Sequence, residues 1–246
     1  MPEAAFPSAW QLSIVQGTAG YRFSLDAFLL ADFVSPCTPQ PLLDLGTGCG
    51  VIALFLARCF PKAFIVGLEL QDTLIAAAGL NVTGNRLTQQ VALLQADARQ
   101  IKNLFSSGAF GTVVCNPPYR VVGSGRINAN PSKAIARHEL TLTLAQLVEA
   151  CRYLLPKGGL LMLIYHPSRL AELCACLMMA HLQPRRLRLV HSTLQTPASM
   201  VLLEAVKDSH DALIVLPPLV IYDVQGNYTT EMQAIFAGRC LGGDVV

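Results

Sequence analysis

Short apolar segments alternate with helical segments from residue 41 onward, and this alternation constrains the fold more than any other feature of the chain. We expect strands at residues 42–45, 63–69, 91–95, 110–115 and 160–165. We expect helices at residues 51–59, 72–80, 142–155 and 168–180. Because consecutive strands joined by helices form right-handed crossovers, the pattern predicts an α/β fold with a mostly parallel sheet and helices on both faces.

The two ends of the chain depart from this pattern. Residues 23–33 predict a short helix with Ser24 as its N-cap, and prolines separate it from the alternating region. We therefore expect a cap segment over residues 1–40 and one compact domain over residues 41–246. Near the other end, three apolar segments without intervening helices predict an antiparallel edge of the sheet. They cover residues 186–191, 200–205 and 213–221.

Composition indicates a large buried core and argues against several classes of protein. Apolar residues make up 52% of the chain and charged residues 14%, which is unlike a disordered protein. No apolar run reaches the ~20 residues that span a bilayer, and no secretory signal pattern opens the chain, so we expect a cytoplasmic protein without a membrane segment. The eight cysteines form no CxxC pair and fit no zinc spacing. We expect them to be buried free thiols, and we expect no metal site.

A rigid polar segment, Asn116-Pro117-Pro118-Tyr119, follows the fourth expected strand. Prolines lack the N–H group that a sheet ladder needs, so the strand has to end there. Ligands of α/β sheets bind at the carboxyl ends of the strands. The side-chain oxygen of Asn116 and a proline carbonyl can accept hydrogen bonds from the two N–H groups of a planar amine, while Tyr119 stacks on the face of the amine's ring. The segment therefore predicts an active site for a substrate with an NH2 group.

Three earlier strand ends carry residues suited to a cofactor that contains a nucleoside. The first strand leads through Asp44 into a glycine loop spaced G-x-G-x-G, which has neither the dinucleotide fingerprint nor a P-loop lysine. Glu69 ends the second strand, where a carboxylate can accept bonds from both ribose hydroxyls. Asp97 follows the third strand, where its carboxylate can accept a hydrogen bond from the exocyclic amine of an adenine. Each residue alone is weak evidence, and their order on successive strand ends makes the set specific.

This set resembles the class I S-adenosylmethionine-dependent methyltransferases, and the segment from Asn116 resembles their amino-methylating branch. The resemblance implies a Rossmann-like, mostly parallel seven-stranded sheet with an antiparallel edge, and S-adenosylmethionine as cofactor. The methionine part would contact Asp44, Gly46 and Gly48. The ribose would contact Glu69, and the adenine would contact Asp97 and Ala98. Further implied cofactor residues are Arg22, Phe23, Ser24, Asp26, Thr47, Leu70 and Asn116.

Two classes of acceptor use this segment: a nucleobase in nucleic acid, and the side-chain amide of a protein glutamine, as in peptide release factor methyltransferases. Residues 20–30 lie directly before the core, which leaves no room for the separate N-terminal domain of glutamine methyltransferases. Residues 120–137 are basic, and residues 219–229 form a distinctive closing segment. Together these features resemble the bacterial tRNA1(Val) adenine N6-methyltransferase family, which modifies the adenine just 3′ of the anticodon. A glutamine acceptor or a small-molecule amine remains the alternative.

The resemblance also implies how the acceptor is held. Asn116, Pro117 and Tyr119 would form the catalytic set, and tRNA would be the partner. The implied substrate-binding residues are Pro118, Tyr119, Arg120, Arg126, Lys133, Arg137 and His138. Within this set, His138 is a candidate base, but its Arg-His-Glu context favours a charge-paired cluster at the pocket rim.

A second basic cluster consists of Arg185, Arg186, Arg188 and His191. Such a cluster suits a phosphate-bearing partner, and it equally suits solvated side chains on an edge strand. The sequence leaves these two interpretations open.

Overall fold

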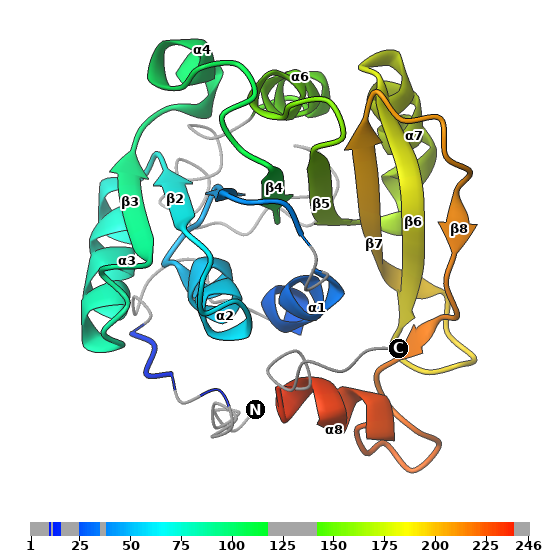
Figure 1. Ribbon diagram of the computed structural model, residues 1–246. Coiled ribbons are helices and arrows are strands. Elements are labelled where there is room, and N and C mark those ends of the chain that lie inside the picture. The colour runs from blue at the N-terminus through cyan, green and yellow to red at the C-terminus, as the bar shows by residue number, and fades with distance from the viewer. Residues whose placement is uncertain (1–9, 11, 16–24, 35–37, 118–141, 239–246) are drawn as a thin grey trace, which may run out of the picture.

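A nine-stranded sheet runs through the centre of the molecule (Figure 1). The computed structural model describes residues 10, 12–15, 25–34, 38–117 and 142–238, and every structural statement below concerns these residues. The strands are β1 (Leu42–Leu45), β2 (Ile65–Glu69), β3 (Val91–Gln95), β4 (Thr112–Cys115), β5 (Leu160–Tyr165), β6 (Leu182–His191), β7 (Ala198–Lys207), β8 (Ile214–Val215) and β9 (Leu219–Val220). Their order is β3-β2-β1-β4-β5-β7-β6-β8, and β9 also pairs with β6.

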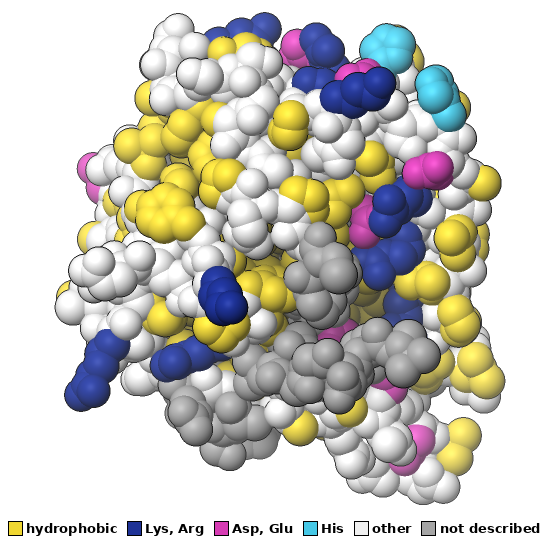
Figure 2. All heavy atoms as spheres, in the orientation of Figure 1, with side chains coloured by type: hydrophobic (Ala, Val, Ile, Leu, Met, Phe, Trp, Pro, Cys, Tyr) yellow, Lys and Arg dark blue, Asp and Glu magenta, His cyan; other side chains and the backbone are white. Residues whose placement is uncertain are grey.

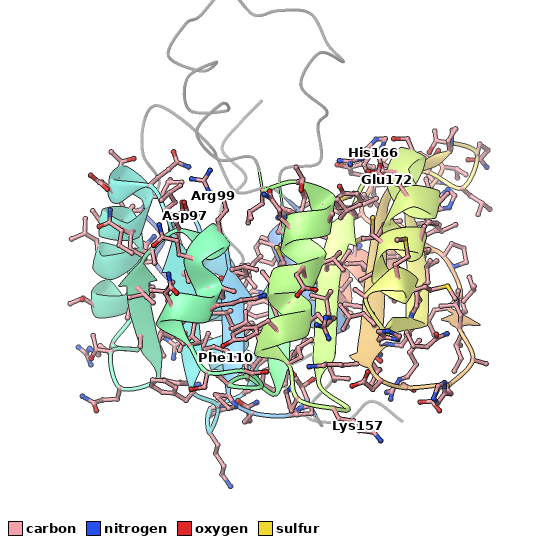
Figure 3. The ribbon with its side chains drawn as sticks, turned by 90° about the horizontal axis from the view of Figure 1, so that it is seen from above. Asp97, Arg99, Phe110, Lys157, His166 and Glu172 are labelled. Carbon is pink, nitrogen blue, oxygen red and sulfur yellow. The ribbon has the colours of Figure 1, made fainter. Side chains whose placement is uncertain are left out.

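Strands β1 to β5 are parallel, so all five end at one edge of the sheet, which we call the carboxyl edge. β7 runs antiparallel to β5 and β6 antiparallel to β7, so β6 also ends at the carboxyl edge. Figure 3 shows both edges: Asp97 and His166, which follow β3 and β5, lie at one, and Phe110 and Lys157 lie at the other. Since ligands of such sheets bind beyond the carboxyl ends, this edge is where the site is expected.

Helices cover both faces of the sheet, as the alternating pattern predicts (Figure 1). One face carries α1 (Leu25–Phe33), α2 (Val51–Cys59), α3 (Asp72–Gly84) and α8 (Thr230–Phe236). The other carries α4 (Ile101–Leu104), α6 (Leu144–Leu154) and α7 (Leu170–Met179). Two short 3-10 turns, η2 (Ala98–Gln100) and η3 (Pro167–Arg169), follow β3 and β5 at the carboxyl edge.

The strands supply a hydrophobic layer to each face because successive side chains of a strand point to opposite sides. Leu42 packs in the layer beneath α1, α2 and α8, whereas Leu43 packs in the layer beneath α4, α6 and α7. Trp10 joins the first layer and lies against the rings of Phe28 and Phe55, with centroids 5.9 and 4.6 Å away. The first layer therefore ties the chain before residue 41 to the sheet.

The predicted strands between residues 42 and 165 are confirmed, with ends that differ by a few residues. The expected single strand over residues 213–221 is divided into β8 and β9, and both pair parallel with β6 rather than antiparallel. Pro217 and Pro218 lie between them and lack the N–H groups that a continuous ladder needs. This division turns the eight expected strands into nine, two more than the seven-stranded sheet that the resemblance implies.

The cysteines are partly as expected. Cys49, Cys115, Cys151, Cys174 and Cys176 are free thiols. Burial raises the pKa of Cys151 to about 12, so this thiol is chemically inert at neutral pH. The expectation is wrong for Cys59, which is disulfide-bonded, because a missing CxxC pair excludes only a local bridge. Among the described helices, none is long and apolar enough to cross a bilayer.

Candidate active site

The glycine loop after β1 adopts a backbone conformation that other residues rarely tolerate. Gly46, Gly48 and Gly50 have φ angles of 78°, 59° and 84°, in the left-handed region. A Cβ atom placed on Gly46 or Gly48 would meet nothing within 4 Å, so the loop turns an open backbone surface outward there. At Gly50 the same atom would lie 3.2 Å from the Cβ of Ala78, so this glycine lets α3 pack closely.

Asp44, the third residue of β1, is fully buried beside this loop. Its Oδ2 atom accepts bonds from the Thr47 hydroxyl (2.5 Å) and the Ala53 backbone N–H (3.1 Å). Its Oδ1 atom is buried and has no hydrogen-bond partner among the residues that the structure describes. Burial, together with the negative charge of Glu69, raises the pKa of Asp44 to about 7. A buried carboxylate with one oxygen unpaired among the described residues suits a cationic ligand group, such as the ammonium of a methionine moiety.

Glu69 ends β2 and fixes the glycine loop from the neighbouring strand. Its Oε2 atom accepts the Gly48 backbone N–H, and its Oε1 atom accepts the backbone N–H groups of Leu70 and Gln71, all at 2.9 Å. A carboxylate offers about four acceptor positions, so about one remains, on Oε2. That position suits one ribose hydroxyl. Binding both hydroxyls, as the sequence led us to expect, would require Glu69 to release a backbone amide.

Asp97 follows β3 at the carboxyl edge and faces Arg99 (Figure 3). Its Oδ1 atom accepts the Arg99 backbone N–H at 2.8 Å, and the two side chains form an ion pair of 2.5 Å. The hydrogen bond and charge of Arg99 hold the pKa of Asp97 below its usual value. Asp97 therefore stays ionised at neutral pH. An adenine amine that bound to Asp97 would share the carboxylate oxygens of Asp97 with Arg99.

Asn116 and Pro117 lie directly beyond the end of β4, and both are half-buried. The last residue of β4, Cys115, stands in register with Leu45 of β1 and Leu163 of β5. Asn116 therefore leaves the sheet between the glycine loop strand and β5. This is the position that the sequence predicts for an amine-binding segment.

Two buried residues that the sequence did not single out hold the segment before α1: Asn81 of α3 and Asn85, the residue that caps the C-terminus of this helix. Asn85 accepts the Ser13 N–H (2.8 Å) and donates to the Ser13 carbonyl (2.7 Å). Asn81 pairs in the same way with Val15, at 2.7 and 3.0 Å. Asn81 also donates to the carbonyl of Cys49 in the glycine loop, at 2.8 Å. One side chain thus joins the N-terminal segment to the loop.

Of the remaining predicted site residues, the structure describes three. Asp26 lies in the first turn of α1 and is half-buried, Leu70 follows β2, and Ala98 opens η2. The others fall outside the described residues: Arg22, Phe23, Ser24, Pro118, Tyr119, Arg120, Arg126, Lys133, Arg137 and His138.

The arginines of the second basic cluster are engaged in ion pairs. Arg185 and Arg186 both contact the buried carboxylate of Glu204, each at 2.9 Å. Arg188 contacts Glu231 of α8 at 2.8 Å. Figure 2 shows this mixture of basic and acidic side chains over the β6 side of the molecule. The contacts favour a structural role for these arginines over a free phosphate-binding surface.

The strand order and the glycine loop at the carboxyl edge define a class I, Rossmann-like methyltransferase. The chain belongs to the methyltransferase small domain family, whose model matches residues 25–183. The family match confirms the predicted enzyme class, a methyltransferase, and the solved structures below support the predicted fold.

Curated relatives share a more particular name. A tRNA1(Val) (adenine(37)-N6)-methyltransferase of Vibrio campbellii is 35% identical over 61% of this chain and 60% of the relative. A protein of the same name from Vibrio cholerae is 31% identical over 79% of each chain.

Solved structures support the fold. A predicted O-methyltransferase from Agrobacterium tumefaciens matches with a TM-score of 0.71 at 21% identity, over 87% of this chain and 97% of that one. A geranyl diphosphate C-methyltransferase from Streptomyces coelicolor, solved with S-adenosyl-L-homocysteine, matches with a TM-score of 0.54 at 16% identity, over 74% and 76%.

Proposed function

We propose that the protein transfers a methyl group from S-adenosylmethionine to the N6 amine of an adenine in tRNA, at the position just 3′ of the anticodon. The observation that carries the proposal is the Asn116-Pro117 pair at the end of β4, one strand away from Asp44 and the glycine loop. The names of the Vibrio relatives support the same acceptor.

The residues at the ends of β1, β2 and β3 suit the cofactor. The unpaired Oδ1 of Asp44 would accept a bond from the methionine ammonium, beside the open backbone of Gly46, Thr47 and Gly48. The remaining acceptor position of Glu69 would hold one ribose hydroxyl, with Leu70 beside it. Asp97 and Ala98 would hold the adenine. When bound, the cofactor supplies a methyl group that its sulfonium has already activated.

Asn116 and Pro117 would orient the acceptor amine. The lone pair of an aromatic amine is delocalised into the ring, which makes the nitrogen a poor nucleophile. The two N–H groups of the amine would donate hydrogen bonds to the Asn116 side-chain oxygen and the Pro117 carbonyl. These bonds would favour a pyramidal nitrogen with a freer lone pair. Positioning of this kind supplies most of the required catalysis, because the proton can leave after transfer. The role expected for Tyr119, stacking on the base, remains a prediction.

A loop of tRNA is a suitable acceptor on physical grounds. Unpaired loop bases are splayed out at lower cost than bases in a duplex, and an adenine at a loop edge can reach a pocket. Basic residues that follow Tyr119 in the sequence would hold the phosphate backbone, so affinity would fall as salt rises.

Incubation with methyl-labelled cofactor tests the proposal. Total tRNA and a protein extract are offered together, and the label is followed by nucleoside and amino-acid analysis. The proposal expects label in N6-methyladenosine from tRNA. Label in a protein glutamine, with none in tRNA, would instead support the release factor type of reaction and overturn the proposal.

A further inference from the structure

A stacked pair of tyrosines lies exposed at the carboxyl edge, away from the end of β4. Tyr222 and Tyr228 face each other across a tight turn, with ring centroids 5.1 Å apart and planes inclined by 23°. Their residues are 36% and 38% exposed. The turn between them is rigid, because Asp223 accepts the backbone N–H groups of Gln225 and Asn227, both at 2.9 Å.

The topology places this pair at the same edge of the sheet as Asn116. β9 runs parallel to β6, and its last residue, Val220, pairs with His191 at the end of β6. The Tyr222 N–H then donates to the carbonyl of Ser192 at 2.9 Å, just beyond the sheet. Since β6 ends at the carboxyl edge, Tyr222 emerges there too.

The pair is the outer end of a series of neighbouring aromatic rings that begins in the core, which we call the aromatic column; its contacts are partly edge-to-face and partly stacked. Tyr228 meets Phe236 of α8 at 4.9 Å, and Phe236 meets Phe28 of α1 at 5.4 Å. Phe28 in turn lies 4.5 Å from the fully buried ring of Phe55. Tyr222 ends the column, and no further ring of the described residues stacks on it. A planar ligand would extend the column onto a surface that is already ordered, with little loss of side-chain entropy.

We propose that the Tyr222–Tyr228 pair is a second RNA-binding site, on which a base of the substrate stacks outside the acceptor pocket. The inference rests on the proposed tRNA acceptor. From β4 to β9 the sheet spans four strand spacings, which is about 19 Å. About five or six stacked nucleotides at ~3.4 Å each cover that length. A base about five or six nucleotides from the methylated adenine, in either direction along the RNA, would therefore reach Tyr222.

Stacking suits this surface better than a phosphate contact. The two charged groups nearest in the chain are already engaged: Asp223 accepts two backbone N–H groups, and Glu231 pairs with Arg188 at 2.8 Å. The surface thus offers ring faces, and neither of these two neighbouring groups is a cation. Recognition through ring faces tolerates any base, so the pair would contribute affinity and leave the choice of the methylated position to the pocket.

Paired substitutions at Tyr222 test the inference by steady-state methylation of tRNA. Tyr222→Leu keeps apolar bulk against Tyr228 but removes the ring face, and it should raise the KM for tRNA roughly 5- to 100-fold. Tyr222→Phe keeps the ring and should leave this KM within about twofold of wild type. For both variants we expect an unchanged kcat and an unchanged Kd for the cofactor.

Phe64→Ala is the matched control, because Phe64 is 48% exposed but lies at the opposite edge, just before β2. It should not change the KM for tRNA. An equal KM for wild type and Tyr222→Leu, with tRNA methylated by both, overturns the stacking site and leaves the proposed function intact. A wild-type enzyme that methylates no tRNA overturns both.

Discussion

Asp44 is the single residue whose chemistry depends most on its surroundings. Burial and the charge of Glu69 raise its pKa to about 7 in the free protein. The same carboxyl in an unfolded chain ionises near 3.8. The unfolded chain therefore releases this proton first, and Asp44 makes the folded protein progressively less stable as pH rises from about 4 to about 7. A cationic ligand group at Oδ1 would relieve that cost.

Cofactor affinity should follow the ionisation of Asp44. Because only the carboxylate attracts an ammonium group strongly, the affinity for S-adenosylmethionine should increase as pH rises from about 6 to about 8. Isothermal titration at several pH values measures this. Asp44→Asn should weaken binding by about 10- to 100-fold at pH 8, the value of a hydrogen bond to a charged group, and should flatten the pH profile. An unchanged profile in the variant would exclude Asp44 as the ammonium partner.

At the scale of elements, local chemistry explains what the sequence could predict. The strands β1 to β5 are largely apolar runs that end at, or within two residues of, a glycine, proline or acidic residue, so their positions could be read directly. α4 has only four residues, too few for a periodic pattern. α8 has seven, and its N-cap Thr229 is the one local signal that could have identified it.

The site was predictable to the extent that its residues stand at strand ends. Asp44, Glu69, Asp97 and Asn116 could be found because the ends of parallel strands converge. The role of Asn81 could not be found from the sequence. Its partners Val15 and Cys49 lie 66 and 32 positions away along the chain, and only folding brings them together. The competing contact of Arg99 with Asp97 depends on the η2 turn, which the sequence pattern does not predict.

The pairing of α3 with the N-terminal segment gives a test at this scale. Asn81→Ala and Asn85→Ala each remove a two-bond link to that segment, so each should lower the free energy of unfolding by about 1–3 kcal/mol in urea titrations. Only Asn81 also holds Cys49 in the glycine loop. Asn81→Ala should therefore weaken cofactor binding several-fold more than Asn85→Ala. Equal cofactor affinities in the two variants would show that the loop does not need this bond.

The ion pairs of β6 and β7 give a second test. Glu204 is buried and joins two arginines, one of which, Arg186, also donates to the Phe33 carbonyl at the end of α1 (2.7 Å). Glu204→Gln should reduce the free energy of unfolding by about 1–3 kcal/mol, because both arginines remain partly solvated. Glu231→Gln should cost less than about 1 kcal/mol, because the side chain of Glu231 is 32% exposed whereas that of Glu204 is 2% exposed. A larger loss for Glu231→Gln would contradict this ranking.

At the scale of the whole molecule, the chemistry gathers at one edge of the sheet. The parallel strands bring the glycine loop, two acidic strand ends and the Asn116-Pro117 segment to the carboxyl edge. The hairpin of β6 and β7 brings β9, and with it the exposed tyrosines, to the same edge. The opposite edge carries the turns before β2, β3 and β5, and none of those proposed site residues that the structure describes. A large substrate would therefore approach from one side only.

The central claim is that Asn116 holds the N6 amine of a tRNA adenine for methyl transfer. The most direct measurement is mass spectrometry of purified tRNA after reaction with wild type and with Asn116→Ala, alongside the cofactor Kd of both. The account predicts N6-methyladenosine just 3′ of the anticodon with wild type, none with the variant, and similar Kd values. Undiminished N6-methyladenosine with Asn116→Ala, or a methyl group on another atom of the tRNA, would contradict it.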